Sequence, residues 1–307
     1  FDVRAFVFYN SLSSMGWLDY CDKDVKGHYD VRMGDIRDSS FVEESMLDCD
    51  IVLHLASLIS IPYSYKSPRS YIETNVIGTL NILEAAKKLN NVKVIHTSTS
   101  EVYGTPLSVP IREDDLLQAQ SPYSASKIGA DQIALAFFKS FQTPVTIIRP
   151  FNTYGPRQST RAVIPSIILQ ILSGNVKIEM GSIYPKRDFS YIQDTVNGFL
   201  AAVKTDEGLG EVINLGSNYE ISIKDTINTI ASLMNTKLEI VSDKRRVRPQ
   251  KSEVDRLLSN NTKAQKLLKW EPKYKGHNGF KKGLQKTIEW FKNNSNLYEN
   301  NSSKYEI

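Results

Sequence analysis

A tyrosine and a lysine four positions apart are the side chains best placed for chemistry in this sequence. Tyr123 and Lys127 belong to the segment Y-S-A-S-K, and their spacing puts both on the same face of a predicted helix. An ammonium group beside a phenol favours the phenolate, so we expect Lys127 to lower the pKa of Tyr123 towards that of a general base. The pattern Y-x-x-x-K also occurs on ordinary surface helices, so the surrounding sequence must show whether this pair is catalytic or merely exposed.

A run of hydroxyl side chains supplies that context. The residues T-S-T-S-E-V-Y-G, from Thr97 to Gly104, follow a predicted strand about twenty positions before Tyr123. At the end of a parallel strand, these hydroxyls and the Glu101 carboxylate would lie where the reactive end of a dinucleotide binds. The structural alternative is a Ser/Thr-rich turn with a solvated glutamate.

Two later segments carry further polar groups: R-P-F-N-T-Y-G-P begins at Arg149, and R-D-F-S-Y-I-Q-D begins at Arg187. With these motifs in this order, the chain resembles the NAD-dependent epimerase/dehydratase family of extended short-chain dehydrogenases, which remodel nucleotide sugars. Other matching stretches are Gly34–Asp38, His54–Ser57, Asn75 and Asn214–Gly216.

The resemblance implies a role for each matching residue. Catalytic residues are Thr99, Ser100, Glu101, Tyr123 and Lys127. Cofactor contacts are Asp35, Ile36, Leu55, Ala56, Ser57, Asn75, Thr97, Tyr123 and Lys127, although Asn75 is better explained as a brace for the sheet. Asn152, Arg187 and Arg248 would hold the sugar diphosphate, because a guanidinium fork suits phosphate. The expected cofactor is NAD; NADP stays open, because the strand ending at Phe8 lacks an acidic residue for the adenosine ribose. No metal site is expected.

Within the family, the stretches Phe8–Ser11 and Ile61–Tyr65 resemble 4,6-dehydratases of N-acetylhexosamine nucleotides, including those of legionaminic acid pathways. Such an enzyme would oxidise C4, remove the C5 proton with Glu101, and release water from C6 to give a 4-keto-6-deoxy sugar nucleotide. Ser100 is a departure, because many of these dehydratases carry there the Asp that protonates the leaving hydroxyl.

Three alternatives follow from the same residues. C4 epimerisation needs Tyr123 and Lys127 but not Glu101. Decarboxylation of a nucleotide-linked glucuronic acid needs a cation near C6, for which Arg245 and Arg246 are candidates. A sensor that binds a dinucleotide or sugar nucleotide without turnover is disfavoured by the intact Tyr-Lys pair and Glu101.

The elements that position these residues alternate between buried strands and amphipathic helices, which predicts an α/β fold with a doubly wound parallel sheet. Predicted strands are Val3–Phe8, Tyr29–Met33, Ile51–Leu55, Val92–Thr97, Val145–Arg149 and Val212–Leu215. Predicted helices are Tyr71–Leu89, Tyr123–Phe141, Val163–Leu172, Asp194–Val203, Ile223–Met234 and Phe280–Lys292.

We therefore expect a dinucleotide-binding domain over residues 1–150 that also includes about 190–216, a substrate-binding cap over 151–292, and a flexible tail over 293–307. The chain opens at Phe1 inside an apolar run, and no Gly-rich loop follows any predicted strand. This suggests a truncated start, with the first strand of the sheet missing and Val3–Phe8 next to the gap.

Composition narrows the class of protein. A net charge of +4 with dispersed Lys and Arg is not the footprint of a nucleic-acid binder, and no apolar run is long enough to span a membrane. Cys21 and Cys49 cannot form a disulfide framework, so a cytoplasmic location is expected. The expected partners are a nucleotide-sugar substrate and a second copy of the chain, docked through Tyr71–Leu89 and Tyr123–Phe141.

Overall fold

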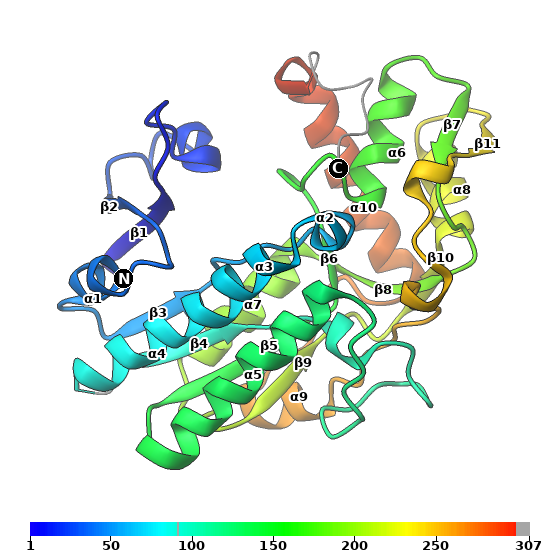
Figure 1. The fold of residues 1–307 in the computed structure, drawn as a ribbon. Helices are drawn as coiled ribbons and strands as arrows, with labels where there is room; N and C mark the ends of the chain where they lie inside the picture. The colour runs from blue at the N-terminus through cyan, green and yellow to red at the C-terminus, as the bar shows by residue number, and fades with distance from the viewer. Residues whose placement is uncertain (91, 299–307) are drawn as a thin grey trace.

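Parallel strands form the centre of the larger lobe in the computed structural model, which describes residues 1–90 and 92–298 (Figure 1). The strands β3 (Ile51–His54), β4 (Lys93–Thr97), β5 (Val145–Pro150) and β9 (Val212–Leu215) pair in the order β3-β4-β5-β9. Every neighbouring pair is parallel. Parallel pairing requires crossover connections, and the helices provide them. The predicted α/β fold of the Rossmann type is therefore confirmed.

The first two strands form a sheet of their own. β1 (Val3–Phe8) pairs in parallel with β2 (Tyr29–Gly34), and α1 (Ser39–Met46) follows them. The sheet was predicted to have a gap next to Val3–Phe8, and within the described residues no hydrogen-bonded register joins β1 to β3. The apolar side chain of Leu53 on β3 is consequently 42% exposed.

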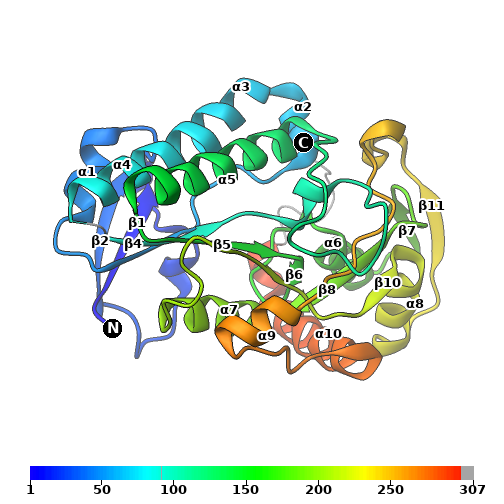
Figure 2. The same cartoon turned by 90° about the horizontal axis from the view of Figure 1, so that it is seen from below.

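Helices cover both faces of the four-stranded sheet (Figure 2). On one face lie α3 (Pro68–Tyr71), η2 (Ile72–Ile77), α4 (Gly78–Lys88) and α5 (Pro122–Phe141). On the other lie α7 (Ile192–Val203) and α9 (Thr262–Leu268). The predicted helix over 71–89 is a longer helical run that contains a π-helical turn at η2, which the hydrophobic spacing does not indicate.

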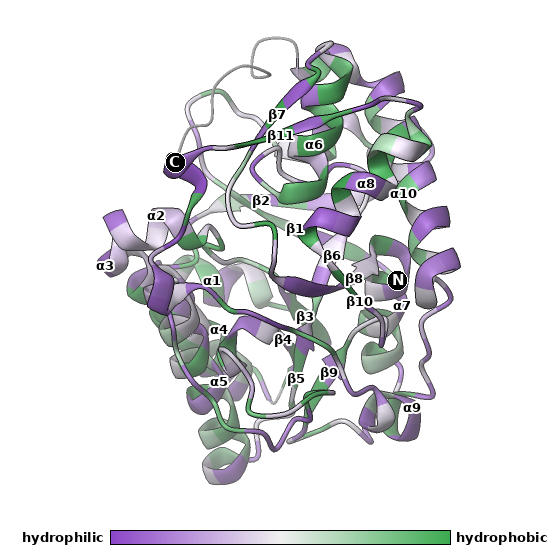
Figure 3. Cartoon of the chain, turned by 90° about the vertical axis from the view of Figure 1, so that its right-hand side faces the viewer, coloured by the Kyte–Doolittle hydropathy of each residue, from purple (hydrophilic) through white to green (hydrophobic). Residues whose placement is uncertain are grey.

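The smaller lobe is a cap of short strands and three long helices. β6 (Asn152–Tyr154), β8 (Lys186–Tyr191) and β10 (Glu220–Ser222) form one sheet, and β7 (Lys177–Met180) pairs with β11 (Glu239–Ser242). The helices are α6 (Val163–Leu172), α8 (Ile223–Leu233) and α10 (Gly276–Asn293). Figure 3 colours α6 mainly as hydrophobic, and its side chains lie at the centre of the cap core.

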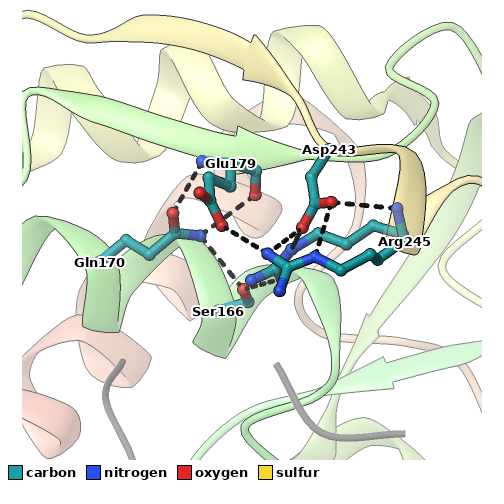
Figure 4. A network of polar contacts seen from close by, with 6 residues as sticks. Ser166, Gln170, Glu179, Asp243 and Arg245 are labelled. Carbon is teal, nitrogen blue, oxygen red and sulfur yellow. Dashed lines mark hydrogen bonds and ion pairs between the residues drawn. The ribbon is translucent and has the colours of Figure 1, made fainter. Parts of the chain in front are cut away.

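A polar network connects α6 to the chain around β7 and β11 (Figure 4). The side chain of Gln170 accepts a hydrogen bond from the backbone N–H of Glu179 at 2.8 Å and donates to Ser166 at 3.3 Å. Arg245, which is 63% exposed, pairs with both Asp243 (2.9 Å) and Glu179 (3.4 Å). These contacts fix the short turn η4 (Lys244–Arg246), from which the chain runs towards the candidate site.

An aromatic cluster joins the two lobes. Trp17, in the turn η1 (Gly16–Tyr20) after β1, lies edge-on to Trp290 of α10 with ring centroids 5.7 Å apart. Tyr298 packs against both rings and is only 6% exposed. These aromatic contacts bury Tyr298 at the end of the turn η6 (Ser295–Tyr298). The flexible tail over 293–307 stays a prediction, and residues 299–307 lie outside the described part. None of the described helices has the length and hydropathy of a membrane span.

Substituting Gly283 tests the packing of α10 against β6. A Cβ at Gly283 would lie 2.1 Å from the Tyr154 hydroxyl oxygen, and this hydroxyl donates to the carbonyl of Phe280 at 3.0 Å. Helix propensity alone favours Gly283→Ala. We expect the opposite, a loss of ~1–3 kcal/mol in the free energy of unfolding from overpacking, measured by urea denaturation. Lys282→Ala, on the exposed face, is the control, and a stabilised Gly283→Ala would contradict this packing.

Candidate active site

The catalytic candidates meet at the carboxyl end of β4. After Thr97 the chain leaves the strand and forms the short turn η3 (Ser100–Tyr103). Thr99 caps this turn, because its hydroxyl accepts the backbone N–H of Glu101 at 3.2 Å. Ser100 is buried and Glu101 is half-buried. The T-S-T-S-E run is therefore a structured turn that orients Glu101, and not a solvated loop.

Helix α5 brings the tyrosine and the lysine to the same place. A reciprocal capping box between Ser121 and Ser124 starts the helix, with Pro122 in its first turn. Tyr123 and Lys127 are 7% and 2% exposed, and the Lys127 ammonium donates to the carbonyl oxygen of Thr97 at 2.6 Å. The dyad is thus anchored directly to the strand that carries the hydroxyl run.

Burial controls the proton affinity of the dyad. Burial raises the pKa of Tyr123, and interaction with the Thr99 side chain lowers it only in part. Burial also lowers the pKa of Lys127 to about 8, with Asp131 acting in the opposite direction. The expectation that Lys127 lowers the pKa of Tyr123 below its ordinary value is therefore wrong for the protein alone, because desolvation of the phenolate outweighs other effects.

The two arginines predicted to bind phosphate lie together around a carboxylate. Arg187 on β8 donates to Glu253 at 3.2 Å, and an Arg248 nitrogen lies 3.6 Å from the same oxygen. The charge of Glu101 raises the pKa of Arg187, in opposition to the effect of burial. A buried nitrogen of Arg248 and the buried Oδ1 of Asn152 have no hydrogen-bond partner within the described residues. Such groups fit a polar ligand.

Sequence reasoning missed Glu253, which follows the turn η5 (Gln250–Ser252). This turn is held from two sides: Ser252 contacts the hydroxyl of Tyr65 in α2 (Ile61–Lys66) at 2.5 Å and donates to the carbonyl of Gln120 at 2.5 Å. The only signal for Glu253 in the sequence is its position five residues after Arg248, and this spacing does not indicate that Glu253 pairs with Arg187.

The residues predicted to hold the cofactor are spread along the ends of β2 and β3. Asp35 binds Arg37 through both carboxylate oxygens, while Ile36 is buried. Asp35 and Arg37 line a cavity of about 420 Å³ together with Asp38, Glu73 and Ile77. Leu55 is 62% exposed and Ala56 is also exposed. A further cavity, of about 510 Å³ between α8 and α10, contains none of the candidate residues.

Asn75 lies in the π-helical turn and is 1% exposed. Its amide oxygen accepts from the Ser57 hydroxyl (3.0 Å) and the Leu58 backbone (2.8 Å), and its nitrogen donates to Ser126 (2.9 Å). These bonds tie the loop after β3 to α5. Asn75 therefore acts as a brace that positions its neighbours. Another cofactor candidate, Thr97, has a buried hydroxyl without a hydrogen-bond partner within the described chain.

Behind the dyad lies a buried ion pair that was not predicted as part of the site. Asp131, one turn after Lys127 on α5, accepts from Arg149 of β5 and from the Ser98 hydroxyl. Arg149 also donates to the hydroxyl of Tyr103 in η3 at 2.9 Å. The pair thus connects the helix of the dyad with the turn that carries Glu101.

Comparison with known proteins agrees with this geometry. The family model described as GDP-mannose 4,6 dehydratase matches residues 1–283. The dTDP-D-glucose 4,6-dehydratase of Homo sapiens is 33% identical over 304 residues, which covers 92% of this chain and 83% of that relative.

Two solved structures are similar over nearly the whole chain. The dTDP-glucose 4,6-dehydratase of Bacillus anthracis, in complex with NAD, has a TM-score of 0.81 at 29% identity and covers 96% of this chain and 89% of its own. The UDP-glucuronic acid 4-epimerase of Bacillus cereus, with UDP-glucuronic acid and NAD, has a TM-score of 0.84 at 27% identity, covering 95% and 91%. The predicted epimerase/dehydratase resemblance is confirmed, and the chain belongs to the GDP-mannose 4,6-dehydratase family.

Proposed function

We propose that this protein is a nucleotide-sugar 4,6-dehydratase that acts on an N-acetylhexosamine nucleotide with NAD as its cofactor. The observation that carries the proposal is the convergence of the Tyr123–Lys127 dyad, the Glu101 carboxylate and Arg187 at the end of β4. Relatives named as 4,6-dehydratases cover most of the chain, which supports the reaction class.

The residues present fit a dinucleotide. Asp35 and Ile36 would meet the adenine, beside the cavity that Asp35 lines, and the exposed loop of Leu55, Ala56 and Ser57 would follow the pyrophosphate. The unpartnered hydroxyl of Thr97, with Tyr123 and Lys127, would face the nicotinamide ribose. Bound NAD would supply a reversible hydride carrier, which would accept hydride from C4 and, once reduced, give it to C6 of the sugar.

The protein's own groups move the protons. Tyr123 accepts the proton of the C4 hydroxyl, and Lys127 favours the phenolate that does so. Oxidation at C4 makes the C5 proton acidic, and Glu101 removes it. The proton that Glu101 took from C5 then passes to the C6 hydroxyl, which leaves as water; Ser100 positions this hydroxyl and does not act as a free acid. Hydride and proton return to C6 and C5, so the product is a 4-keto-6-deoxy sugar nucleotide.

Substrate recognition rests on the arginine pair. Arg187 and Arg248 would bind the diphosphate, with Asn152 beside them, because these buried groups suit an anion with several acceptor oxygens. Tyr65 fixes the η5 turn next to this pair. Tyr65 belongs to the stretch Ile61–Tyr65 that resembles enzymes of N-acetylhexosamine nucleotides, and this supports the choice of sugar.

C4 epimerisation is the second candidate, favoured by the epimerase of Bacillus cereus among the similar structures and by Ser100 in place of an acid. Decarboxylation is less well supported, because Arg245 is largely exposed and paired with Asp243 and Glu179.

A Glu101→Gln variant separates the two leading reactions. With each candidate sugar nucleotide, the wild-type protein should give a product lighter by one water and, in heavy water, labelled at C5. In Glu101→Gln, oxidation at C4 should survive while elimination slows by about 10²–10⁴-fold, so reduced cofactor accumulates and is measured by its absorbance.

Glu113→Gln is the matched control for that experiment. Glu113 is a neighbouring carboxylate that accepts the backbone N–H of Asn214, and it has no place in the chemistry. Its variant should turn over without accumulation of reduced cofactor. If Glu101→Gln turned over fully, and the product carried no deuterium and had the mass of the substrate, the reaction would be C4 epimerisation and not dehydration.

We also propose that a homodimer forms through the layer of η2, α4 and α5. Ile77 on η2 is 41% exposed, and Phe141 at the end of α5 is 46% exposed. Light scattering should give twice the chain mass at micromolar concentration, and Ile77→Glu should give a monomer. Val196→Glu is the control, because Val196 is 40% exposed on α7 at the opposite face of the sheet. A wild-type monomer would refute the dimer.

A further inference from the structure

The proposed chemistry makes no use of the charged groups buried behind the dyad. Asp131 is 0% exposed and lies four residues after Lys127, on the same face of α5. Its Oδ2 accepts from Ser98 at 2.8 Å and from Arg149 at 3.0 Å. Its Oδ1 lies 3.3 Å from His96 without forming a hydrogen bond. Burying a carboxylate this completely carries a large desolvation penalty, which an opposite charge and hydrogen bonds must offset.

Several elements carry titratable or charged groups around the Tyr123–Lys127 dyad. These groups are Tyr123 and Asp131 on α5, His54 on β3, His96 on β4, Arg149 on β5, Glu101 on η3 and Tyr71 on α3. Burial lowers the pKa of both histidines, which favours the neutral form of each ring. Asp131 is the group whose charge acts on Lys127 in the direction opposite to burial.

We propose that Asp131, on the same face of α5, is the buried negative charge that favours the ammonium form of Lys127, and that it is therefore a positioning residue for the Tyr123–Lys127 dyad. The inference rests on the proposed function, which gives the dyad its role. Arg149 holds the carboxylate in place with a fork of two nitrogens, both 3.0 Å from Oδ2. Ser98, at the end of β4, holds it from the second side.

The consequence is a shift of both limbs of the pH profile. Burial lowers the pKa of Lys127 to about 8, and without the Asp131 charge it should fall further. Burial raises the pKa of Tyr123, and Asp131 adds to that rise, so removing the charge should ease ionisation of the phenol. An opposite charge within ~4–6 Å shifts a pKa by about 1–3 units. Loss of the carboxylate should therefore move the whole profile to lower pH.

Asp131→Asn in the full chain with NAD tests this. The rate of the first hydride transfer is followed by absorbance from pH 5.5 to 9.5, with the sugar nucleotide that the wild type converts. The alkaline limb should move down by about 1–2 pH units, so the deficit against wild type should be about tenfold larger at pH 8 than at pH 6. An equal loss at every pH would assign Asp131 a structural role and overturn the proposal.

A buried carboxylate elsewhere provides the matched control. Asp194 is 1% exposed and accepts the backbone N–H groups of Lys273 and Tyr274, remote from the dyad. Asp194→Asn should lower the melting temperature and leave the alkaline limb where it is. Ser98→Ala removes one hydrogen bond to Asp131 without changing its charge, and should also leave the limb in place.

Arg149 can be left uncompensated in Asp131→Asn, and the variant can then fail to fold. The double variant Asp131→Asn, Arg149→Met removes both charges and is used in that case. Its Lys127 is titrated by carbon-13 NMR of the lysine ε-carbons, with the signal identified by its absence in Lys127→Met. A midpoint at least one pH unit below wild type supports the proposal, and an unchanged midpoint overturns it. This titration needs no substrate, so it distinguishes failure of the inference from failure of the proposed reaction.

Discussion

The ion pair between Asp131 and Arg149 is the interaction on which the site depends. Both side chains are almost wholly buried, and removing two charges from water costs several kcal/mol for each ion. The structure offsets that cost with hydrogen bonds from Ser98 to the carboxylate and from the guanidinium to Tyr103. Through these partners one pair fixes helix α5, the ends of β4 and β5, and the turn η3 relative to one another.

That constraint explains how residues with different roles come to share one site. Tyr103 receives the bond from Arg149 and donates in turn to Asn214 of β9 at 2.8 Å. The turn that orients Glu101 is therefore attached to the last strand of the sheet as well as to the strand before it. Arg248 and Glu253 lie on either side of η5, which is attached to α2 and to the residue before Ser121.

The sequence predicted what depends on short-range pattern. The bounds of α6, β1 and β9 are as predicted, because strong apolar spacing determines them. The lack of a Gly-rich loop after any predicted strand also predicted the gap next to β1, where no register joins β1 to β3 within the described residues. Short-range pattern missed Glu253, which meets Arg187 across 66 positions. The pKa of Tyr123 was predicted in the wrong direction, because spacing along a helix does not report burial.

The contact between Trp17 and Trp290 has a consequence for biosynthesis. The two rings come from opposite ends of the described chain, so the ribosome must add about 270 residues after the first before the second exists. At typical rates of synthesis this takes on the order of half a minute. During that interval the indole of Trp17 has no native partner in the cap. Until the cap has been synthesised, a chaperone or another nascent chain can bind Trp17 in place of Trp290.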